Sequence, residues 1–387
     1  MRRVRAFFAS NSVQSGADPS GCIAYLCLQA TREGQASHAH VHEIICGLRA
    51  RGWGIQLLEP HYAGSARQPG LFAKLWAFFS VQWRLWLKFR SWQALYIRAH
   101  PAAFPTAIIA WMLKIPVIQE INGPYHELFT MFPKARMLRP LIAATAMIPL
   151  RIATSLIVVT PQLREYVDQH IGSRPANVIP NGANTGAFCP AAPRRLDLPK
   201  RYVVFFGALA KWQGLADLLA AVSGPEWPTG ISLVIAGAGS EQDAVVKAAA
   251  QNPEIIYLGR VPYSEMPGLI AHSIAGLSPK NNVSGHRDTG LSPLKMYETL
   301  ACGVPVIVTD FPGPAELVHL HHCGLVIPEG SPKAIADAVA YLCSHPDEAR
   351  AMGKRGRDAV VHSHSWDRRA ADTDAVLCSV LGRHGRE

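Results

Sequence analysis

The chain has 387 residues, of which 49% are hydrophobic and 17% charged, and its formal net charge is +10. This length and composition predict a globular protein with more than one core, and they exclude a disordered or fibrous chain. The eight cysteines form no CxxC pair and mostly lie in apolar runs, which excludes a disulfide-stapled secreted domain and favours a reducing cytosol.

The N-terminal 20 residues are expected to form a poorly structured extension. Arg2, Arg3 and Arg5 are followed by too few apolar residues for a secretory signal. The formal charge is +13 up to residue 195 and −3 from residue 196 onward. A basic first half predicts an anionic surface or acceptor as its partner. No nucleic-acid motif accompanies this charge, so nucleic acid is not expected as a partner.

Strands and helices alternate through the first half, which predicts a parallel sheet with right-handed crossovers. Apolar residues recur at helical spacing between residues 37 and 51, and Gly52 ends that helix. The expected strands are 23–29, 53–58, 94–97 and 116–120, and the expected helices are 37–51 and 103–113.

Two apolar stretches bear on membranes. Residues 71–92 contain four Trp and four Phe interrupted by basic residues, so they do not span a bilayer. They predict a basic, aromatic helix in the lipid interface, with a buried helix as the alternative. Trp76 and Phe79 fall on its aromatic face, which Phe89 extends. Residues 141–159 approach spanning length, but Pro149 and a central arginine predict a core helix followed by a strand.

The second half repeats the alternation after a Pro-rich linker at 188–201. Ligands of parallel sheets bind beyond the carboxyl ends of the strands, so the cleft between two such sheets is the expected site. The expected strands are 202–206, 231–236, 255–258, 276–278 and 304–309, and the expected helices are 215–222, 241–252, 267–271 and 293–302.

The segment 290–318 carries the most chemical information. Ser292 is a helix N-cap candidate, and Pro293 fits the first helical position. Gly303 ends the helix, and a β-branched run follows as a buried strand. Glu298 lies about two turns from the helix terminus where an anion would bind. This spacing places a ribose-binding carboxylate one nucleotide-length from a phosphate-binding helix end.

This segment resembles the donor-site signature of family 4 retaining glycosyltransferases, in the variant form SPLKxxE. Further landmarks follow in the family's order: GQAS at residue 34, VIPNGANTGAFCP, FG at residue 206, VIAGAGSE, YLGRVPYSEMPGLI and HSWDRRA. The resemblance implies an α/β protein of GT-B fold, with two Rossmann-like domains whose parallel sheets face a central cleft. It implies an acceptor-binding domain at 1–190, a nucleotide-sugar-binding domain at 191–365, and a C-terminal helix at 366–387 that packs back on the first domain.

The resemblance also implies site residues. A lysine beside the helix terminus meets the diphosphate, and Glu298 binds the ribose. Glu316 either holds the donor or caps the next helix. The implied catalytic residues are Lys295, Lys211, Glu120 and Asn122. The implied donor-binding residues are Gly207, Lys211, Ser292, Pro293, Leu294, Lys295, Glu298 and Glu316. The implied acceptor-side residues are Gly34, Gln35, Ser37, His38 and Asn181.

The chain departs from the usual family pattern at three positions. Many members have an arginine and a lysine where this chain has Ala208 and Gln213, so Lys211 and Lys295 are expected to replace them. Many members have a first glutamate where this chain has Gly290. Asp288 is the candidate substitute.

No metal or cofactor is expected. His38, His40 and His42 alternate, but only two of them share a helical face and no acid or cysteine completes a ligand set. The only Asp-x-Asp, at 372–374, is expected on a solvated helix face. Cations and a helix terminus are therefore expected to meet the leaving diphosphate.

The implied function is transfer of a sugar, with retention, from a nucleotide-diphosphate sugar to a glycan or lipid-linked acceptor in cell-surface polysaccharide or glycolipid synthesis. The expected location is cytoplasmic, peripheral on an anionic membrane face. The alternatives are a nucleotide-sugar epimerase of the same fold and a non-catalytic membrane-associated scaffold. Gly290 weighs against the epimerase.

Overall fold

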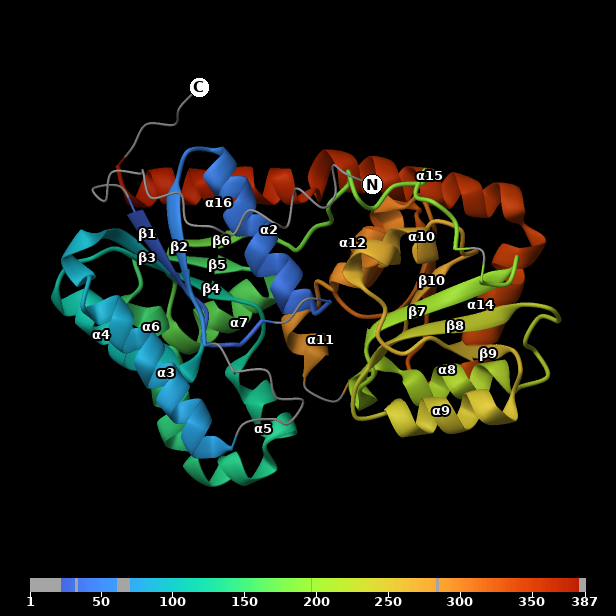
Figure 1. Cartoon of the computed structure of the whole chain (residues 1–387), viewed down its shortest axis with the longest axis horizontal. Coiled ribbons are helices and arrows are strands. Elements are labelled where there is room, and N and C mark those ends of the chain that lie inside the picture. The colour runs from blue at the N-terminus through green and yellow to red at the C-terminus, as the bar shows by residue number, and fades with distance from the viewer. Residues whose placement is uncertain (1–21, 32–33, 61–69, 196, 283–284, 383–387) are drawn as a thin grey trace.

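The computed structural model of the chain describes residues 22–31, 34–60, 70–195, 197–282 and 285–382. The expected N-terminal extension, with its three arginines, lies outside these residues. Two six-stranded sheets lie side by side, each covered by helices on both faces (Figure 1). Every strand pairing in both sheets is parallel, which confirms the predicted α/β class.

The first sheet has the strand order β2-β1-β3-β4-β5-β6. Its strands are β1 (Cys22–Leu26), β2 (Gly54–Leu58), β3 (Trp92–Arg98), β4 (Val117–Ile121), β5 (Ser155–Val158) and β6 (Ala176–Val178). The helices of this half are α2 (Ala36–Ala50), α3 (Leu71–Trp86), α4 (Phe104–Met112), α5 (Leu128–Met131), α6 (Arg139–Ile152) and α7 (Pro161–Ile171). Short 3₁₀ turns lie between them: η2 (Phe89–Ser91), η3 (Pro101–Ala103), η4 (Tyr125–Glu127) and η5 (Pro133–Leu138).

The second sheet has the order β12-β11-β10-β7-β8-β9. Its strands are β7 (Tyr202–Ala208), β8 (Ser232–Ala238), β9 (Ile255–Tyr257), β10 (Gly276–Ser278), β11 (Val306–Thr309) and β12 (Gly324–Ile327). The helices are α8 (Leu215–Val222), α9 (Gln242–Gln251), α10 (Met266–Ile270), α11 (His286–Thr289), α12 (Leu294–Ala301), α13 (Pro314–His321), α14 (Pro332–Ser344), α15 (Pro346–Ser363) and α16 (Trp366–Val380). Two 3₁₀ turns, η6 (Lys211–Gln213) and η7 (Tyr263–Glu265), complete this half.

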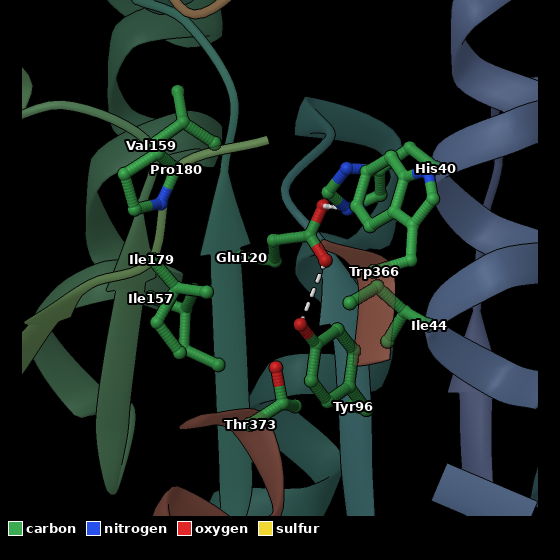
Figure 2. Close-up of a pocket in the computed structure, with 10 residues that line it drawn as sticks. All are labelled: His40, Ile44, Tyr96, Glu120, Ile157, Val159, Ile179, Pro180, Trp366 and Thr373. Carbon is green, nitrogen blue, oxygen red and sulfur yellow. Dashed lines mark hydrogen bonds and ion pairs between the residues drawn. The ribbon is translucent and has the colours of Figure 1, made fainter. Parts of the chain in front are cut away.

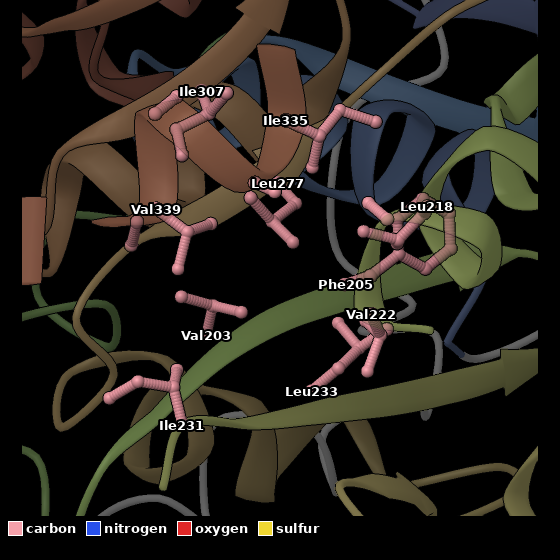
Figure 3. Close-up of a cluster of buried hydrophobic side chains, with 14 of the residues drawn as sticks. Val203, Phe205, Leu218, Val222, Ile231, Leu233, Leu277, Ile307, Ile335 and Val339 are labelled. Atoms are coloured by element: carbon pink, nitrogen blue, oxygen red, sulfur yellow. The ribbon is translucent and has the colours of Figure 1, made fainter. Parts of the chain in front are cut away.

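The central strand β7 shows why these sheets are apolar on both faces. Val203 and Phe205 point to the core formed with α8 and α14, where Leu218 is fully buried (Figure 3). Val204 and Phe206 point to the opposite core, formed with α10 and α12. Because side chains alternate along a strand and both faces are covered, β7 reads as a continuous hydrophobic run.

The C-terminal helices connect the two halves (Figure 1). The backbone of Ala183 pairs with Ser365 in an isolated parallel bridge, and α16 then packs along α2. The packing is close: a Cβ placed on Gly47 of α2 would lie 2.4 Å from the Cβ of Ala370. Asp374 is not on a purely solvated face as expected, because it accepts a hydrogen bond of 2.5 Å from the indole of Trp53.

The aromatic stretch 71–92 is not one helix. The helix α3 ends at Trp86, η2 follows, and Trp92 already begins β3. Phe89 is therefore buried beneath the sheet edge and does not extend the aromatic face, contrary to the prediction. The inner face of α3 is formed by Val81, Gln82 and Leu85, whereas Trp76 and Phe79 are exposed.

The second apolar stretch forms α6 and β5, as expected. Only Pro149 and Leu150 of α6 are buried, so this helix covers the sheet with its last turn and is not the core helix that the sequence suggested. Within the described part of the chain, no helix has both the length and the apolarity needed to cross a membrane.

Candidate active site

A cavity of about 610 Å³ lies between the carboxyl ends of the two sheets, where parallel α/β folds bind ligands. Gly34 and Gln35 come from the loop after β1 and Ser37 from the first turn of α2. Arg98 ends β3, and Asn122 directly follows β4. The second half contributes a larger set from β7, β8, β10 and α12: Gly207, Gly237, Lys280, Ser292, Pro293, Leu294, Lys295 and Glu298. Most of the residues singled out from the sequence thus meet in one cavity.

The start of α12 differs from the prediction. Pro293 occupies the N-cap position with an extended backbone, and the Ser292 side chain caps no helical N–H. The Ser292 hydroxyl instead accepts a hydrogen bond of 2.9 Å from the backbone N–H of Asn181, which lies in the other half of the chain. The Asn181 amide also donates to the Ser292 carbonyl at 2.5 Å. The Ser292 hydroxyl therefore joins the two halves of the chain and does not cap α12.

Lys295 is a buried cation at the cavity wall. Its ammonium group donates to the Gln213 side chain at 2.9 Å and lies 4.0 Å from the ring centre of Phe205, within cation–π range. Burial, followed by repulsion from Lys280, lowers the pKa of Lys295 well below its ordinary value. The site therefore holds an ammonium group whose charge is poorly compensated by protein.

The second cation of the cavity is Lys280, which follows β10, and not Lys211. Lys211 begins η6 with an exposed side chain and does not line the cavity, so the role predicted for it is corrected here. Lys280 is 8% exposed, and burial lowers its pKa to about 8, with a small opposing effect of Glu127. Among the described residues, none accepts a hydrogen bond from the Lys280 ammonium group.

Two facing glycines leave bare backbone at the cavity wall. Gly207 of β7 has a φ of +113°, and Gly237 pairs with it in β8 with a φ of +146°. A Cβ on Gly237 would lie only 1.9 Å from the Gly207 carbonyl oxygen. Only glycine fits there, and the absence of side chains allows a ligand to approach the main chain closely.

Glu298 lies on the same cavity-facing side of α12 as Lys295. Its carboxylate accepts a hydrogen bond of 2.7 Å from the hydroxyl of Tyr263. Burial raises the pKa of Glu298 to about 7, against the opposing effects of Tyr263 and Lys295. Burial and the adjacent Glu298 raise the pKa of Tyr263 well above its usual value, so the phenol stays a donor.

The wall of the first half is organised around Glu120, which is only 1% exposed. Its carboxylate accepts a hydrogen bond from Tyr96 at 2.7 Å and lies 2.9 Å from the imidazole of His40 (Figure 2). It also accepts from Arg98 at 2.8 Å. Burial opposes its charge, but His40 and Arg98 together hold its pKa far below the ordinary range. Glu120 is thus ionised and hydrogen-bonded to its neighbours. It does not line the large cavity, although the sequence predicted it as a catalytic residue.

Asn122, which does line the cavity, donates to Glu120 at 2.5 Å. His38 does not line it; its ring stacks on that of His42, with centroids 4.0 Å apart. The described residues contain no cluster of three or more histidines, cysteines or carboxylates that could hold a metal ion.

The other candidate acids also lie outside the cavity lining. Asp288 is exposed on α11. Glu316, in the first turn of α13, accepts from the amide of Gln162 at 2.8 Å. Gly290 has a φ of +65°, and a Cβ there would lie 2.8 Å from the Gln162 side chain, so the family's usual glutamate would be strained at this position.

Sequence reasoning missed Lys280, Arg260 and Tyr263, which all line the cavity. The sequence could have indicated Lys280, because it comes two residues after a buried strand, and ligands of parallel sheets bind at that end of the strands. Tyr263 lay within the landmark YLGRVPYSEMPGLI but was not singled out. Its contact with Glu298 spans 35 residues of sequence, so no local pattern indicates it.

Solved structures share this two-sheet arrangement. The sucrose-phosphate synthase of Thermosynechococcus elongatus superposes with a TM-score of 0.76 at 17% identity, over 94% of this chain and 99% of that one. Anabaena HepE, solved in complex with UDP-glucose, superposes with a TM-score of 0.69 at 14% identity, over 93% and 100%. At these identities the likeness defines the fold: two Rossmann-like domains facing a cleft, the GT-B class.

Two sequence profiles then define the family. The profile of glycosyltransferase family 4 matches residues 37–187, and that of the glycosyl transferases group 1 matches residues 192–359. The chain belongs to the family 4, group 1 glycosyltransferases, as its motifs predicted.

Curated relatives match part of the chain. A GDP-mannose-dependent alpha-(1-6)-phosphatidylinositol monomannoside mannosyltransferase of Mycobacterium tuberculosis is 31% identical over 204 residues, which are 50% of this chain and 53% of that protein. The D-rhamnosyltransferase WbpZ of Pseudomonas aeruginosa is 28% identical over 200 residues, 50% of this chain and 49% of that protein. The chain thus matches about half the length of these relatives.

Proposed function

We propose that the chain is a retaining glycosyltransferase that moves a sugar from a nucleotide-diphosphate sugar to an acceptor. The observation that carries this proposal is the pair Lys280 and Lys295, two buried ammonium groups at one cavity with no carboxylate in salt-bridge contact among the described residues. Buried charges normally have partners, so this pair calls for an anion with more than one charge. A diphosphate meets that need.

The rest of the cavity suits the remainder of the donor. Glu298 offers a carboxylate to ribose hydroxyls, and Gly207 and Gly237 offer bare backbone for close approach to a phosphate. As the sugar–phosphate bond breaks, negative charge grows on the leaving diphosphate, and two preorganised ammonium groups stabilise that charge more than the ground state. Retention by front-face attack, with the leaving phosphate assisting deprotonation, is what family membership implies.

We propose that no divalent metal takes part, because the two lysines can take over its electrostatic role. The acceptor hydroxyl would enter from the first-domain wall, between the Gly34–Ser37 loop and Asn122. The donor class is tested with a thermal-shift panel of UDP, GDP and ADP. A nucleotide at 100 times its dissociation constant should stabilise the fold by about 2.7 kcal/mol. Activity abolished by a chelator and restored by manganese would overturn the metal-free part.

We further propose that the acceptor is lipid-linked and is met at an anionic, cytoplasmic membrane face. The support is a broad exposed apolar surface on the first half. It comprises Leu71, Phe72, Leu75, Trp76, Phe79, Trp83 and Leu87 on and beside α3, Trp111, Met112 and Leu113 at the end of α4, Met137 and Leu138 at the end of η5, and Leu141 in the first turn of α6. Apolar patches of this kind on soluble domains mark interaction sites.

Basic residues are interspersed with this surface, including Lys74, which lies over the ring of Phe132 at 5.8 Å, as well as Arg84 and Lys88. Aromatic rings with neighbouring cations favour the headgroup region of an anionic bilayer. This surface belongs to the same half of the chain that carries the excess charge of +13. Flotation of the wild-type chain with phosphatidylglycerol vesicles tests the membrane proposal.

A further inference from the structure

A series of polar contacts connects Glu120 of β4, in the first sheet, to the start of α12. The Glu120 carboxylate lies 2.9 Å from His40 Nε2, and His40 Nδ1 lies 2.7 Å from Asn181 Oδ1. The Asn181 amide nitrogen donates to the Ser292 carbonyl, and the Ser292 hydroxyl lies 3.1 Å from the Tyr297 hydroxyl of α12. His40 and Asn181 are both more than nine-tenths buried.

The direction of the hydrogen bonds that Asn181 makes in this series can be assigned. A backbone carbonyl only accepts, so the Asn181 nitrogen must face Ser292 and its oxygen must face His40. That oxygen accepts, so His40 Nδ1 carries a proton. On the other side of the ring, Nε2 lies 2.9 Å from Glu120 Oε1, the oxygen that Arg98 also contacts, and makes no hydrogen bond of acceptable geometry with any described residue. The directional contact of the ring is therefore the one from Nδ1 to Asn181.

We infer that His40 acts, through its contact with Asn181, as a positioning residue that fixes the start of α12 against the first domain. Resting on the proposed function, this assigns His40 the task of aligning the donor half of the cavity with the acceptor half. The nearby Leu294 supports the assignment, because this α12 residue packs into the core of the first domain beside Ile23 and Trp366.

The other neighbours of the His40 ring do not reach α12. Glu120 faces it from β4, and Arg98, Tyr25 and Tyr96 all donate to that carboxylate. From α16, the Trp366 ring meets the imidazole at right angles, with centroids 5.4 Å apart (Figure 2). Asn181 is thus the contact through which His40 acts on Ser292.

The first test is nuclear magnetic resonance of protein labelled with ¹³C and ¹⁵N in histidine, with the His40 signals assigned by their loss in His40→Gln. In the wild-type chain the ¹⁵N shift of Nδ1 should be that of a protonated nitrogen, because the Asn181 oxygen accepts a hydrogen bond from it. A bare Nδ1 in the wild type would overturn the inference, whether or not any variant folds.

The second test separates positioning from binding. His40→Gln and Asn181→Asp should lower kcat about tenfold or more, because both break the bridge between the halves. Nucleoside diphosphate affinity should change by less than about threefold, because the lysines and Glu298 remain in place. His42→Gln, on the same helix but without contact to Asn181 or Glu120, is the control and should keep wild-type kinetics.

The two proposals fail in different ways. If His40→Gln lowers nucleotide affinity and kcat in parallel, or changes neither, the positioning role is wrong while the glycosyltransferase assignment stands. If the wild type binds no nucleoside diphosphate and cleaves no nucleotide sugar, the proposed function fails. The chemical shifts of His40 still decide its protonation state in that case.

Discussion

At the scale of single residues, the cavity contains buried ionisable side chains whose charges do not stabilise the empty folded protein. Burial depresses the pKa of both Lys280 and Lys295, and it raises the pKa of Glu298 to about 7. Each shift means that the charged form is disfavoured in the empty folded state. Ionisable side chains with such shifted pKa values cluster at functional sites, where a bound ligand can supply the missing charge partner.

The depressed pKa of Lys280 predicts a pH dependence of nucleotide binding. The empty site holds a charged Lys280 below about pH 8 and a neutral one above it, whereas a bound diphosphate requires the charge. Affinity for a nucleoside diphosphate, measured by calorimetry, should therefore fall as pH rises through about 8. Lys280→Met should bind more weakly and lose this slope. Lys211→Met, which changes an exposed lysine outside the cavity, should behave as wild type; equal effects of the two substitutions would refute the assignment of Lys280.

Glu298 should show opposite effects on stability and on binding. Its carboxyl pKa is raised above the unfolded value, so its charge destabilises the empty fold increasingly as pH rises from about 4.5 to about 7. At pH 8, Glu298→Gln should raise the free energy of unfolding by roughly 1–3 kcal/mol. The same substitution should weaken donor binding by roughly 1.5–3 kcal/mol, because charge-assisted hydrogen bonds to the ribose are lost. Urea unfolding and calorimetry give the two numbers; unchanged donor affinity would exclude a ribose contact.

At the scale of elements, α3 carries large apolar side chains that are exposed although the helix is already packed against the sheet by its other face. Trp76 is 69% and Trp83 50% exposed, yet the inner face of the same helix is fully packed. The substitutions Trp76→Ser, Phe79→Ser and Trp83→Ser together should abolish flotation with phosphatidylglycerol vesicles and leave nucleotide binding intact. The matched control replaces three exposed apolar residues of the second half, Val246, Leu320 and Val361, by serine. A wild-type chain that ignores anionic vesicles would contradict the membrane proposal.

The loop between α11 and α12 gives a further prediction at this scale. Gly290 stands where many relatives carry a glutamate, but its positive φ strains any other residue, and a side chain there would have to displace that of Gln162. Gly290→Glu should therefore cost about 1–3 kcal/mol in the free energy of unfolding and restore no activity. A stable variant with raised turnover would show that the loop can adopt the family's usual conformation.

Prediction from sequence succeeded where the signal was local. The helix α8 has the predicted bounds, and Gly207 and Glu298, singled out from strand and helix patterns together with the family resemblance, do line the cavity. It failed where a distant contact decides the outcome. Ser292 looks like an N-cap, but its hydroxyl is taken by Asn181, 111 residues earlier in the chain. Lys211 and Lys280 both follow strands, and only the geometry of the two loops directs one into the cavity and the other to solvent.

At the scale of the whole molecule, the two halves form one site because several contacts join them away from the substrate. The helix α16 packs on α2, Asn181 holds Ser292, and Thr160 donates to the Thr289 carbonyl at 2.5 Å. Lys280 and Lys295 belong to one half and the Gly34–Ser37 segment to the other, so neither half alone carries the complete cavity. The composition predicted more than one core, but it could not indicate these few contacts, which set how the cores face each other.

Release of nucleoside diphosphate from a panel of UDP-, GDP- and ADP-linked hexoses, with and without a bacterial lipid extract, tests the central claim most directly. The account predicts that the wild type cleaves at least one donor without added metal, and faster with lipid. Glu298→Ala and Lys280→Met should each lower this rate by about tenfold or more, with Lys211→Met unaffected. A wild-type chain that cleaves no donor under either condition, or a Glu298→Ala variant as active as wild type, would contradict it.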